Sequence, residues 1–352
     1  MYTDSARLLV YALVTLLTLS PASTYKILSN QTLTRLPRPQ TDFDIHNGRL
    51  LSPILRTRVP GSSGSKLVRN HFTQFISREV PTYNIELHKT VTNGTPVINF
   101  IAVRDPPGIS KGNISRLTLV AHYDSRAEPA GFIGAIDSAA PVAMILHAIR
   151  SIDAALTRKW QSGPELGNPR GVQIIFTDAE EGFREGDDML YGARALASEW
   201  EQSVYAPGSR YPNRIKAIEL FVLLDLLGSK GPKIMSFFNA THGAYNNIAV
   251  LEKRLRELRQ FKSKGDAWFV DAGPRKDVPV RYPIYDDQVP FEQREVDILH
   301  LIDMDPGTLA FPTVWHTLED NGESLDLDVV EDWSVLLTAF VAEWLDLEGY
   351  MT

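Results

Sequence analysis

Residues 171–181 read Gly-Val-Gln-Ile-Ile-Phe-Thr-Asp-Ala-Glu-Glu, an apolar run that ends abruptly in three carboxylates. A short apolar run without polar alternation predicts a strand buried on both faces, as in a parallel sheet covered by helices. The same pattern, an apolar run followed by ionisable residues, recurs at residues 116–124 and 218–225. We therefore expect a sheet whose strands deliver acidic and imidazole side chains to one edge.

Segments with helical periodicity separate these strands. The helices are predicted at residues 66–79, 138–156, 188–200, 247–260 and 329–347, and further strands at 84–91, 96–103, 296–302 and 313–315. Gly61-Ser-Ser-Gly-Ser65 supplies the turn and N-cap of the first helix, and Pro141 falls in the first turn of the second. The alternation predicts a single α/β domain, with a central, mostly parallel mixed β-sheet flanked by helices on both faces.

The composition narrows the possible chemistry. The chain of 352 residues is 43% hydrophobic and 22% charged, which excludes disordered and fibrous classes and allows a large core. It contains no cysteine, so thiol nucleophiles, disulfides and thiolate metal ligands are excluded. The 36 Lys and Arg residues against 43 Asp and Glu residues give a net charge of −7, which argues against nucleic acid as a partner.

The N-terminus resembles a secretory signal peptide. Residues 8–19 are apolar, follow Arg7 and precede the small and polar residues 20–24, and the run is short for a bilayer span. We assign residues 1–24 to a signal peptide, with a signal anchor or a buried helix as alternatives. A polar, proline-containing arm at 25–58 and the main domain at 59–352 follow.

Four Asn-x-Ser/Thr sequons also favour the secretory route; they lie at Asn30, Asn93, Asn113 and Asn239. We therefore expect a secreted or Golgi-lumenal glycoprotein that keeps no stable membrane span after signal cleavage.

Ionisable residues follow the buried strands of the predicted sheet. They are His122, Asp124, Glu180, Glu181, Asp225 and His316, and Asp137 stands at the start of the helix predicted at 138–156. Taken singly, each has an ordinary explanation as an ion-paired carboxylate, a solvated charge or a hydrogen-bonded histidine. Together, carboxylates and imidazoles converging without cysteine are the ligand set of a catalytic zinc with an open position. The remaining histidines are interpreted as structural or exposed; they are His46, His71, His88, His147 and His242, apart from His300 discussed below.

At these residues the chain resembles the glutaminyl cyclases of the animal and fungal type, glutaminyl-peptide cyclotransferases built on a zinc-aminopeptidase-like fold. The resemblance runs in family order from about residue 45 to the C-terminus. The matching stretches are HYDS at 122–125, GAIDSAAP at 134–141, DAEEGF at 178–183, LYGAR at 190–194, LLDLLG at 223–228, DDQVPF at 286–291, LHLI at 299–302 and VWHTLEDN at 314–321.

The resemblance implies that Asp137, Glu181 and His316 hold one Zn²⁺ ion per chain and that Glu180 is the acid/base. The implied substrates are peptides or proteins with an N-terminal glutamine, with N-terminal glutamate as a second candidate. The chemistry agrees with this role, because an amide needs a Lewis acid on its oxygen and a proton donor for the leaving nitrogen.

The resemblance also implies a carboxylate network, formed by the catalytic residues Asp225 and Asp286 with His300 in support. Trp315 and Phe311 would line the substrate pocket, and we group His300 with them as a substrate-binding residue. Like charges in this network would raise the pKa of the acid/base.

The main alternative is a secreted di-zinc aminopeptidase of the same fold. His122 and Asp225 stand where such enzymes complete a second metal site, so His122 and Asp124 are second-metal or structural candidates. The context of Asp137, followed by serine rather than asparagine, and the Asp286-Asp287 pair favour the cyclase. An inactive binding module is disfavoured by the intact ligand set, and a serine hydrolase by the position of Ser62–Ser65 before a surface helix.

Three departures from the family pattern stand out. Relatives often carry a pocket tryptophan near Gly186, where this chain reads Arg-Glu-Gly-Asp-Asp over residues 184–188, and Gln288 is histidine in the animal pattern. Relatives in the secretory route carry a cysteine pair at the positions of Ala121 and Val142. Their absence implies metal loops held by packing and hydrogen bonds alone.

Overall fold

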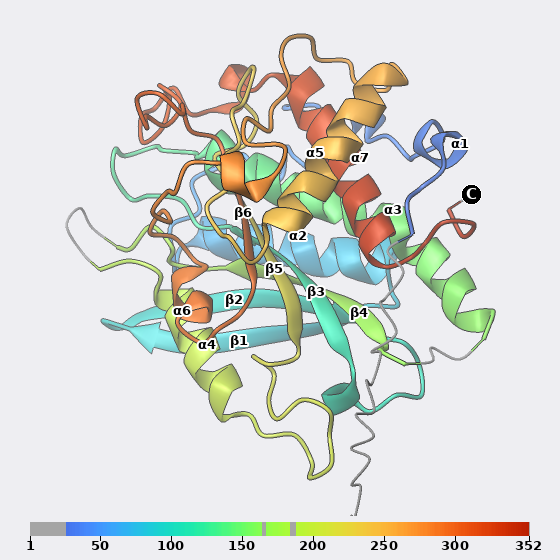
Figure 1. Ribbon diagram of the computed structural model, residues 1–352. Helices are drawn as coiled ribbons and strands as arrows, with labels where there is room; N and C mark the ends of the chain where they lie inside the picture. Colours follow the sequence, from blue (N-terminus) through green and yellow to red (C-terminus); the bar gives the residue numbers. More distant parts are fainter. Residues whose placement is uncertain (1–25, 164–166, 184–187, 352) are drawn as a thin grey trace, which may run out of the picture.

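A computed structural model describes residues 26–163, 167–183 and 188–351. The predicted signal peptide and the position of Gly186 lie outside the described residues. Figure 1 shows a central twisted sheet with helices on both sides.

The sheet has the spatial order β1-β2-β4-β3-β5-β6. Its strands are β1 (Asn84–Thr92), β2 (Thr95–Arg104), β3 (Ser115–His122), β4 (Arg170–Thr177), β5 (Ile218–Asp225) and β6 (Ile298–Ile302). Strands β3 to β6 pair in parallel, whereas the hairpin β1–β2 joins β4 in antiparallel fashion. The predicted mostly parallel mixed sheet is confirmed, and every residue of β3 and β4 is buried.

Helices cover both faces of the sheet, as expected. They are α1 (Asn30–Leu33), α2 (Ser63–Glu79), α3 (Ala140–Gln161), α4 (Tyr191–Gln202), α5 (His242–Glu257), α6 (Val289–Glu292) and α7 (Leu327–Trp344), with short helical turns η1 (Gln40–Phe43), η2 (Lys111–Asn113), η3 (Ala135–Ala139), η4 (Arg275–Asp277) and η5 (Gly322–Ser324). The larger core joins one face of the sheet to α2, α3, α5 and α7, and the smaller core joins the other face to α4 and α6.

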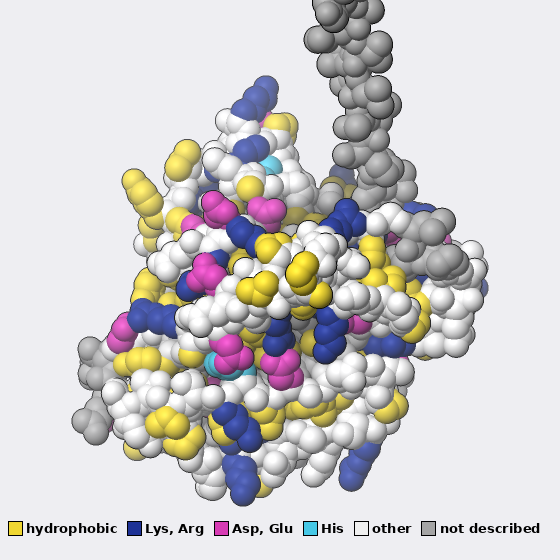
Figure 2. Space-filling view, turned by 90° about the horizontal axis from the view of Figure 1, so that it is seen from below, with side chains coloured by type: hydrophobic (Ala, Val, Ile, Leu, Met, Phe, Trp, Pro, Cys, Tyr) yellow, Lys and Arg dark blue, Asp and Glu magenta, His cyan; other side chains and the backbone are white. Residues whose placement is uncertain are grey.

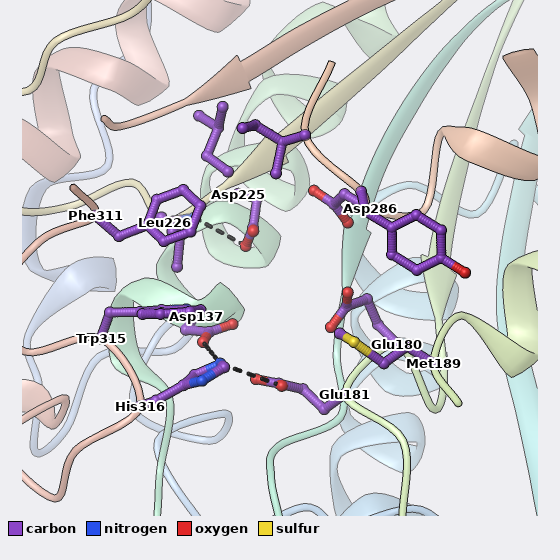
Figure 3. A pocket seen from close by; sticks show the side chains of 13 residues that line it. Asp137, Glu180, Glu181, Met189, Asp225, Leu226, Asp286, Phe311, Trp315 and His316 are labelled. Atoms are coloured by element: carbon purple, nitrogen blue, oxygen red, sulfur yellow. Dashed lines mark hydrogen bonds and ion pairs between the residues drawn. The ribbon is translucent and has the colours of Figure 1, made fainter. Parts of the chain in front are cut away.

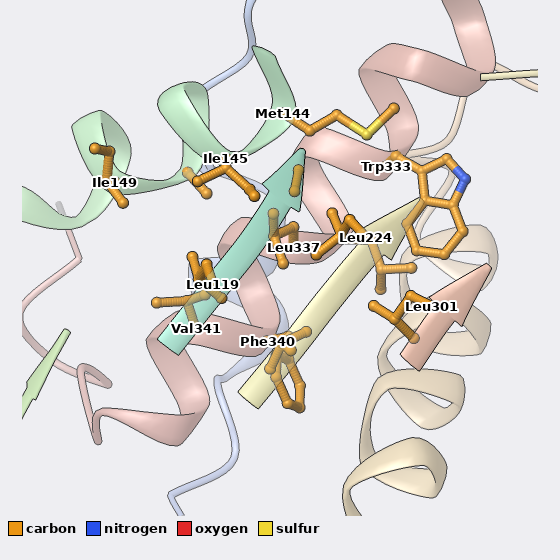
Figure 4. Packing of buried hydrophobic residues seen from close by; sticks show 14 of the residues in the cluster. Leu119, Met144, Ile145, Ile149, Leu224, Leu301, Trp333, Leu337, Phe340 and Val341 are labelled. Atoms are coloured by element: carbon orange, nitrogen blue, oxygen red, sulfur yellow. The ribbon is translucent and has the colours of Figure 1, made fainter. Parts of the chain in front are cut away.

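The larger core is built by α3 and α7 lying against β3, β5 and β6. In Figure 4, Ile145 of α3 and Leu337 of α7 approach Leu119 and Leu224 of the sheet. Both helices are apolar around most of their surface because they pack on the sheet and on each other. The stretch Ala135–Gln161 has the length and composition of a membrane span, but 78% of its apolar window is buried, as in a core helix of a soluble domain.

The arm at 26–58 packs on the domain along its length. Leu28, Leu33 and Phe43 are buried in the larger core, and Arg38 donates a 2.9 Å hydrogen bond to Glu331 on α7. Its last residue, Arg58, reaches the loop that precedes α3.

Two local predictions are wrong. Residues 313–315 form turns rather than a strand: Trp315 N–H donates to Pro312 O (2.9 Å) and Thr317 N–H to Val314 O (3.1 Å), so the backbone groups are satisfied locally. His88 and His242 are buried rather than exposed. Both keep the structural role, since each ring is hydrogen-bonded, His88 to Asn99 (3.0 Å) and His242 to Ser236 (2.8 Å).

In Figure 2, basic and acidic side chains are interspersed over the face seen from below, without a continuous field of one sign.

Candidate active site

The parallel strands deliver their ionisable residues to one edge, as predicted. His122 is the last residue of β3 and lies opposite Thr177, the last residue of β4, while Asp225 ends β5. The carboxyl ends of parallel strands meet at the same edge, so the residues after β4 lie next to those that end β3. The start of α4 ties this segment down, because Leu190 N–H donates to Glu180 O (3.0 Å).

These residues surround a hollow of about 380 Å³, including its open mouth. Figure 3 shows Trp315 and His316 on one side and Glu180 with Asp286 on the other. The lining residues are Asp137, Glu180, Glu181, Met189, Asp225, Leu226, Ile284, Tyr285, Asp286, Ile302, Phe311, Trp315 and His316. The structure thus brings eight of the predicted site residues to one cavity.

Asp137, Glu181 and His316 form a candidate metal triad. Their ligand atoms all lie within 4.8 Å of one another, with His316 Nε2 at 3.5 Å from Asp137 Oδ2 and 3.3 Å from Glu181 Oε2. Burial lowers the pKa of His316 to about 4, which keeps the ring neutral and able to bind a metal. The buried oxygens Asp137 Oδ2 and Glu181 Oε1 accept no hydrogen bond from protein. A divalent cation fits this donor set, since it would compensate two buried carboxylates.

A second cluster lies beside the triad and shares Asp137. The ligand atoms of His122, Asp137 and Asp225 also lie within 4.8 Å of one another. Here the side chains contact one another: His122 Nε2 lies 2.7 Å from Asp137 Oδ1 and 3.5 Å from Asp225 Oδ1, and Ser138 Oγ donates to Asp225 Oδ1. Burial lowers the pKa of His122, but the surrounding carboxylates outweigh it and raise that pKa well above its usual value. Burial likewise opposes ionisation of Asp225, yet hydrogen bonds from His122 and Ser138 lower its pKa.

The paired glutamates after β4 point in different directions. In Figure 3 the Glu181 carboxylate faces His316, whereas the Glu180 carboxylate lies on the same side of the hollow as Asp286 and points toward it. Burial, followed by repulsion from Glu181, raises the pKa of Glu180 well above its usual value. Asp124 fixes both residues by accepting their backbone N–H groups, from Glu180 at 3.1 Å and from Glu181 at 3.2 Å. Asp124 is therefore placed as a support of the loop.

Asp286 lines the hollow and is held from behind. Its Oδ1 accepts the N–H of Asp287 (2.6 Å), and its Oδ2 lies 2.9 Å from His300 Nε2. His300 does not line the hollow: the ring is fully buried on β6, two residues before the strand ends, and can reach a substrate only through Asp286. The grouping of His300 with the substrate-binding residues is therefore corrected to support of Asp286.

Aromatic rings form one wall of the hollow. Trp315 stacks on His316 with ring centroids 3.8 Å apart and contacts Phe311 at 4.6 Å. Tyr285 and Met189 also border the hollow, and in Figure 3 Met189 lies beside Glu180, opposite Trp315. Gln288, one of the departures, is buried outside the hollow and donates to Ile284 O (2.5 Å), so it supports the segment that carries Tyr285.

Several supporting residues were missed from the sequence. Arg58 donates to the carbonyls of Gly134 (2.9 Å) and Asp137 (3.2 Å), and Asp320 accepts the N–H of Ile136 (2.8 Å). Arg126 contacts Glu181. The Asp320 position lies within a quoted family stretch, but nothing in the residue pattern signals the long-range contacts of these side chains.

The loop that carries Asp137 requires glycine at position 134. Gly134 has φ = 61°, and a Cβ placed there would lie 2.0 Å from the backbone oxygen of Asp137. Only a residue without a side chain allows this close approach.

Fold and site together define the class: a zinc-aminopeptidase-like α/β domain with an acid–imidazole triad at the carboxyl edge of its sheet. The chain matches the profile of peptidase family M28 over residues 106–341. It is 37% identical over 313 residues to the mouse protein named glutaminyl-peptide cyclotransferase-like protein, covering 85% of this chain and 75% of that one. The chain belongs to peptidase family M28 and, within it, to the glutaminyl-peptide cyclotransferases.

Two further comparisons agree. The glutaminyl-peptide cyclotransferase of Boiga irregularis is 36% identical over 310 residues, covering 84% of this chain and 80% of that one. The crystal structure of the glutaminyl cyclase of Macrostomum lignano superposes with a TM-score of 0.73 at 27% identity, covering 92% of this chain and 96% of that one.

Proposed function

We propose that this chain converts the N-terminal glutamine of peptides or proteins to pyroglutamate with release of ammonia, using one zinc ion held by Asp137, Glu181 and His316. One observation carries the proposal: the Glu180 carboxylate lines the same hollow as the triad, directly next in the chain to the triad residue Glu181. The names of the relatives support the same reaction.

Glu180 has the environment of a general acid and base. The reaction requires the α-amine of glutamine to attack its own γ-carboxamide carbon, while the amide nitrogen leaves as ammonia. Glu180 takes the proton from the amine and gives it to the departing nitrogen. Its raised pKa makes the carboxylate a stronger base toward the amine proton than an ordinary glutamate. Zinc in the triad would supply polarisation of the amide carbonyl and stabilisation of the developing oxyanion.

Other lining residues bind and orient the substrate. Asp225 and Asp286 present carboxylates to the hollow, where they suit the cationic or hydrogen-bonding α-amine. Trp315 and Phe311 supply an apolar wall against which the aliphatic part of the glutamine side chain packs. Like-charge repulsion from Asp286 adds to the raised pKa of Glu180.

The test is ammonia release from a Gln-initiated peptide by the purified chain, before and after zinc removal with a strong chelator. Glu180→Gln should abolish turnover and retain zinc, whereas Glu257→Gln, on the exposed face of α5, should leave turnover unchanged. Loss of zinc in Glu180→Gln would mean that the roles of the two glutamates are exchanged.

The second candidate is a di-zinc aminopeptidase, which the cluster around His122 and Asp225 could serve. A metal count separates the two: one zinc per chain supports the cyclase. Two zinc ions with leucine-aminopeptidase activity and no ammonia from Gln-peptides would refute it.

We also propose passage through the secretory route. Asn93 lies exposed in the turn between β1 and β2, whereas Asn113 is half-buried and accepts the backbone N–H of Arg210 (2.8 Å). In a secretory host, the glycosidase-sensitive mass shift should shrink by one glycan in Asn93→Gln and stay unchanged in Asn113→Gln. Cytosolic retention of the full chain would contradict this route.

A further inference from the structure

Arg126 occupies an unexpected position at the mouth of the metal triad. It follows β3 in a loop, and its side chain is 21% exposed. Its Nη1 lies 3.1 Å from Glu181 Oε2 and 3.4 Å from His316 Nε2. Two of the three atoms that would bind zinc are therefore within hydrogen-bond distance of one guanidinium nitrogen.

These contacts conflict with metal binding at the same atoms. A neutral imidazole has one ring lone pair, and His316 Nε2 cannot offer it both to a guanidinium N–H and to a metal ion. Glu181 Oε2 lies 3.3 Å from His316 Nε2, so a metal that binds both atoms enters the space that Nη1 approaches. A cation at this distance also repels a divalent ion.

The side chain has a route out of the triad. Arg126 Nε donates to Glu128 O (3.1 Å) in an exposed part of the loop, and the side chain borders solvent. Because the side chain already borders water, the guanidinium can move into solvent by rotating the side chain alone. It can therefore leave the triad while the backbone of the loop stays in place.

We propose that Arg126 competes with the metal ion for Glu181 and His316, and thereby weakens metal binding and keeps it reversible. The inference rests on the metal triad of the proposed function and adds a role for a residue outside that triad. Without Arg126, the two ligand atoms are free of a cationic competitor.

The experiment measures the dissociation constant for Zn²⁺ of the full chain by competition with a chromophoric chelator at pH 8.5, where protons compete least. Loss of one hydrogen bond to a charged group predicts that Arg126→Gln binds Zn²⁺ about ten-fold or more tightly than the wild type. Arg126→Lys, which keeps the charge but not the planar fork, should fall between them. Arg214→Gln is the matched control, because Arg214 is similarly exposed (23%) and is paired with Glu86 on β1.

The opposite role makes the opposite prediction. If Arg126 instead orients Glu181 as a metal ligand, Arg126→Gln binds Zn²⁺ more weakly; that result, or unchanged affinity, overturns the competition. Zinc should also raise the reactivity of Arg126 toward phenylglyoxal in the wild type while leaving that of Arg214 unchanged, and a lack of increase at Arg126 overturns the proposal too. No Zn²⁺ binding by the wild type or by Arg126→Gln would refute the triad itself, and with it the proposed function.

Discussion

Arg58→Met tests whether the metal-bearing loop is held by the N-terminal arm. Arg58 is completely buried, and its guanidinium donates to the carbonyls of Ile133, Gly134 and Asp137. Methionine keeps much of the apolar volume but removes the guanidinium donor from all three carbonyls. Gly134 O keeps the N–H of Ala139 (3.2 Å), whereas the carbonyls of Ile133 and Asp137 lose their partner.

The structure sets the size of the effect. Each buried polar group that loses its partner costs about 1–3 kcal/mol, and local relaxation recovers part of the sum. Removing one partner of a buried charged network costs about 3–5 kcal/mol, so we expect the free energy of unfolding to fall by that amount. The matched control is Arg49→Met, because Arg49 is 65% exposed and its ion pair with Asp42 should contribute at most about 1 kcal/mol.

The assay is urea unfolding with excess chelator in every sample, so that zinc binding does not contribute to the measured stability. The midpoint should fall at an unchanged m-value. A loss no larger than that of Arg49→Met would refute the idea that Arg58 carries the loop.

Three further predictions concern the site and its surroundings. Gly134→Ala should lower zinc content at metal-limiting concentrations, measured by mass spectrometry, because the new Cβ collides with the Asp137 carbonyl. Asp124→Asn should reduce kcat about 10- to 100-fold by replacing one of the two oxygens that hold the glutamate pair, measured by ammonia release. Burial lowers the pKa of His147 to about 4, so the folded state keeps the ring neutral, whereas the unfolded chain takes up a proton below about pH 6.5. Between pH 7 and 4.5, the free energy of unfolding of the wild type should therefore fall by about 2–3 kcal/mol more than that of His147→Asn. Urea unfolding at both pH values measures this difference.

Each prediction has an outcome that contradicts it. Unchanged zinc content in Gly134→Ala would remove the steric argument, with Gly243→Ala in the open part of α5 as control. Full activity of Asp124→Asn would make its two hydrogen bonds irrelevant to turnover. Identical pH dependence of the wild type and His147→Asn would mean that another group titrates.

The sheet was predictable because its strands are local apolar runs with distinctive ends. The stretch 171–181 specifies both a doubly buried strand and the two glutamates that follow it, so β4 and Glu180 could be read from adjacent residues. Parallel strands bring their carboxyl ends together, which predicts that the ionisable residues after β3, β4 and β5 converge. The resemblance supplied the choice of Asp137, Glu181 and His316 as the triad, and residues 313–315 before His316 form turns rather than a strand. The resemblance supplied Asp286, which no strand pattern in the sequence places at the site.

The supporting contacts could not be predicted, since they join segments far apart in the chain. Arg58 follows a proline-containing stretch that reads as a polar arm, yet its side chain is buried against a loop 79 positions later. Thr313–Trp315 has the composition of a short strand but lacks a strand partner, and its backbone closes into turns. In both cases tertiary context overrides the local pattern.

The contacts of the loop bearing Asp137 also determine when, during synthesis of the chain, the triad can form. The N–H of Ile136 in this loop donates to Asp320, which is synthesised 184 positions later. Arg58, which donates to the Asp137 carbonyl, is synthesised 79 positions before Asp137 and is therefore already present. Contacts of such sequence separation form late in folding, and a chain leaves the ribosome from its N-terminus. A nascent chain that lacks its last 40 residues therefore holds Glu180 and Glu181 without a closed triad. Only the finished polypeptide can therefore bind the metal ion in a closed triad. A chain truncated before Asp320 should leave the ribosome without bound metal.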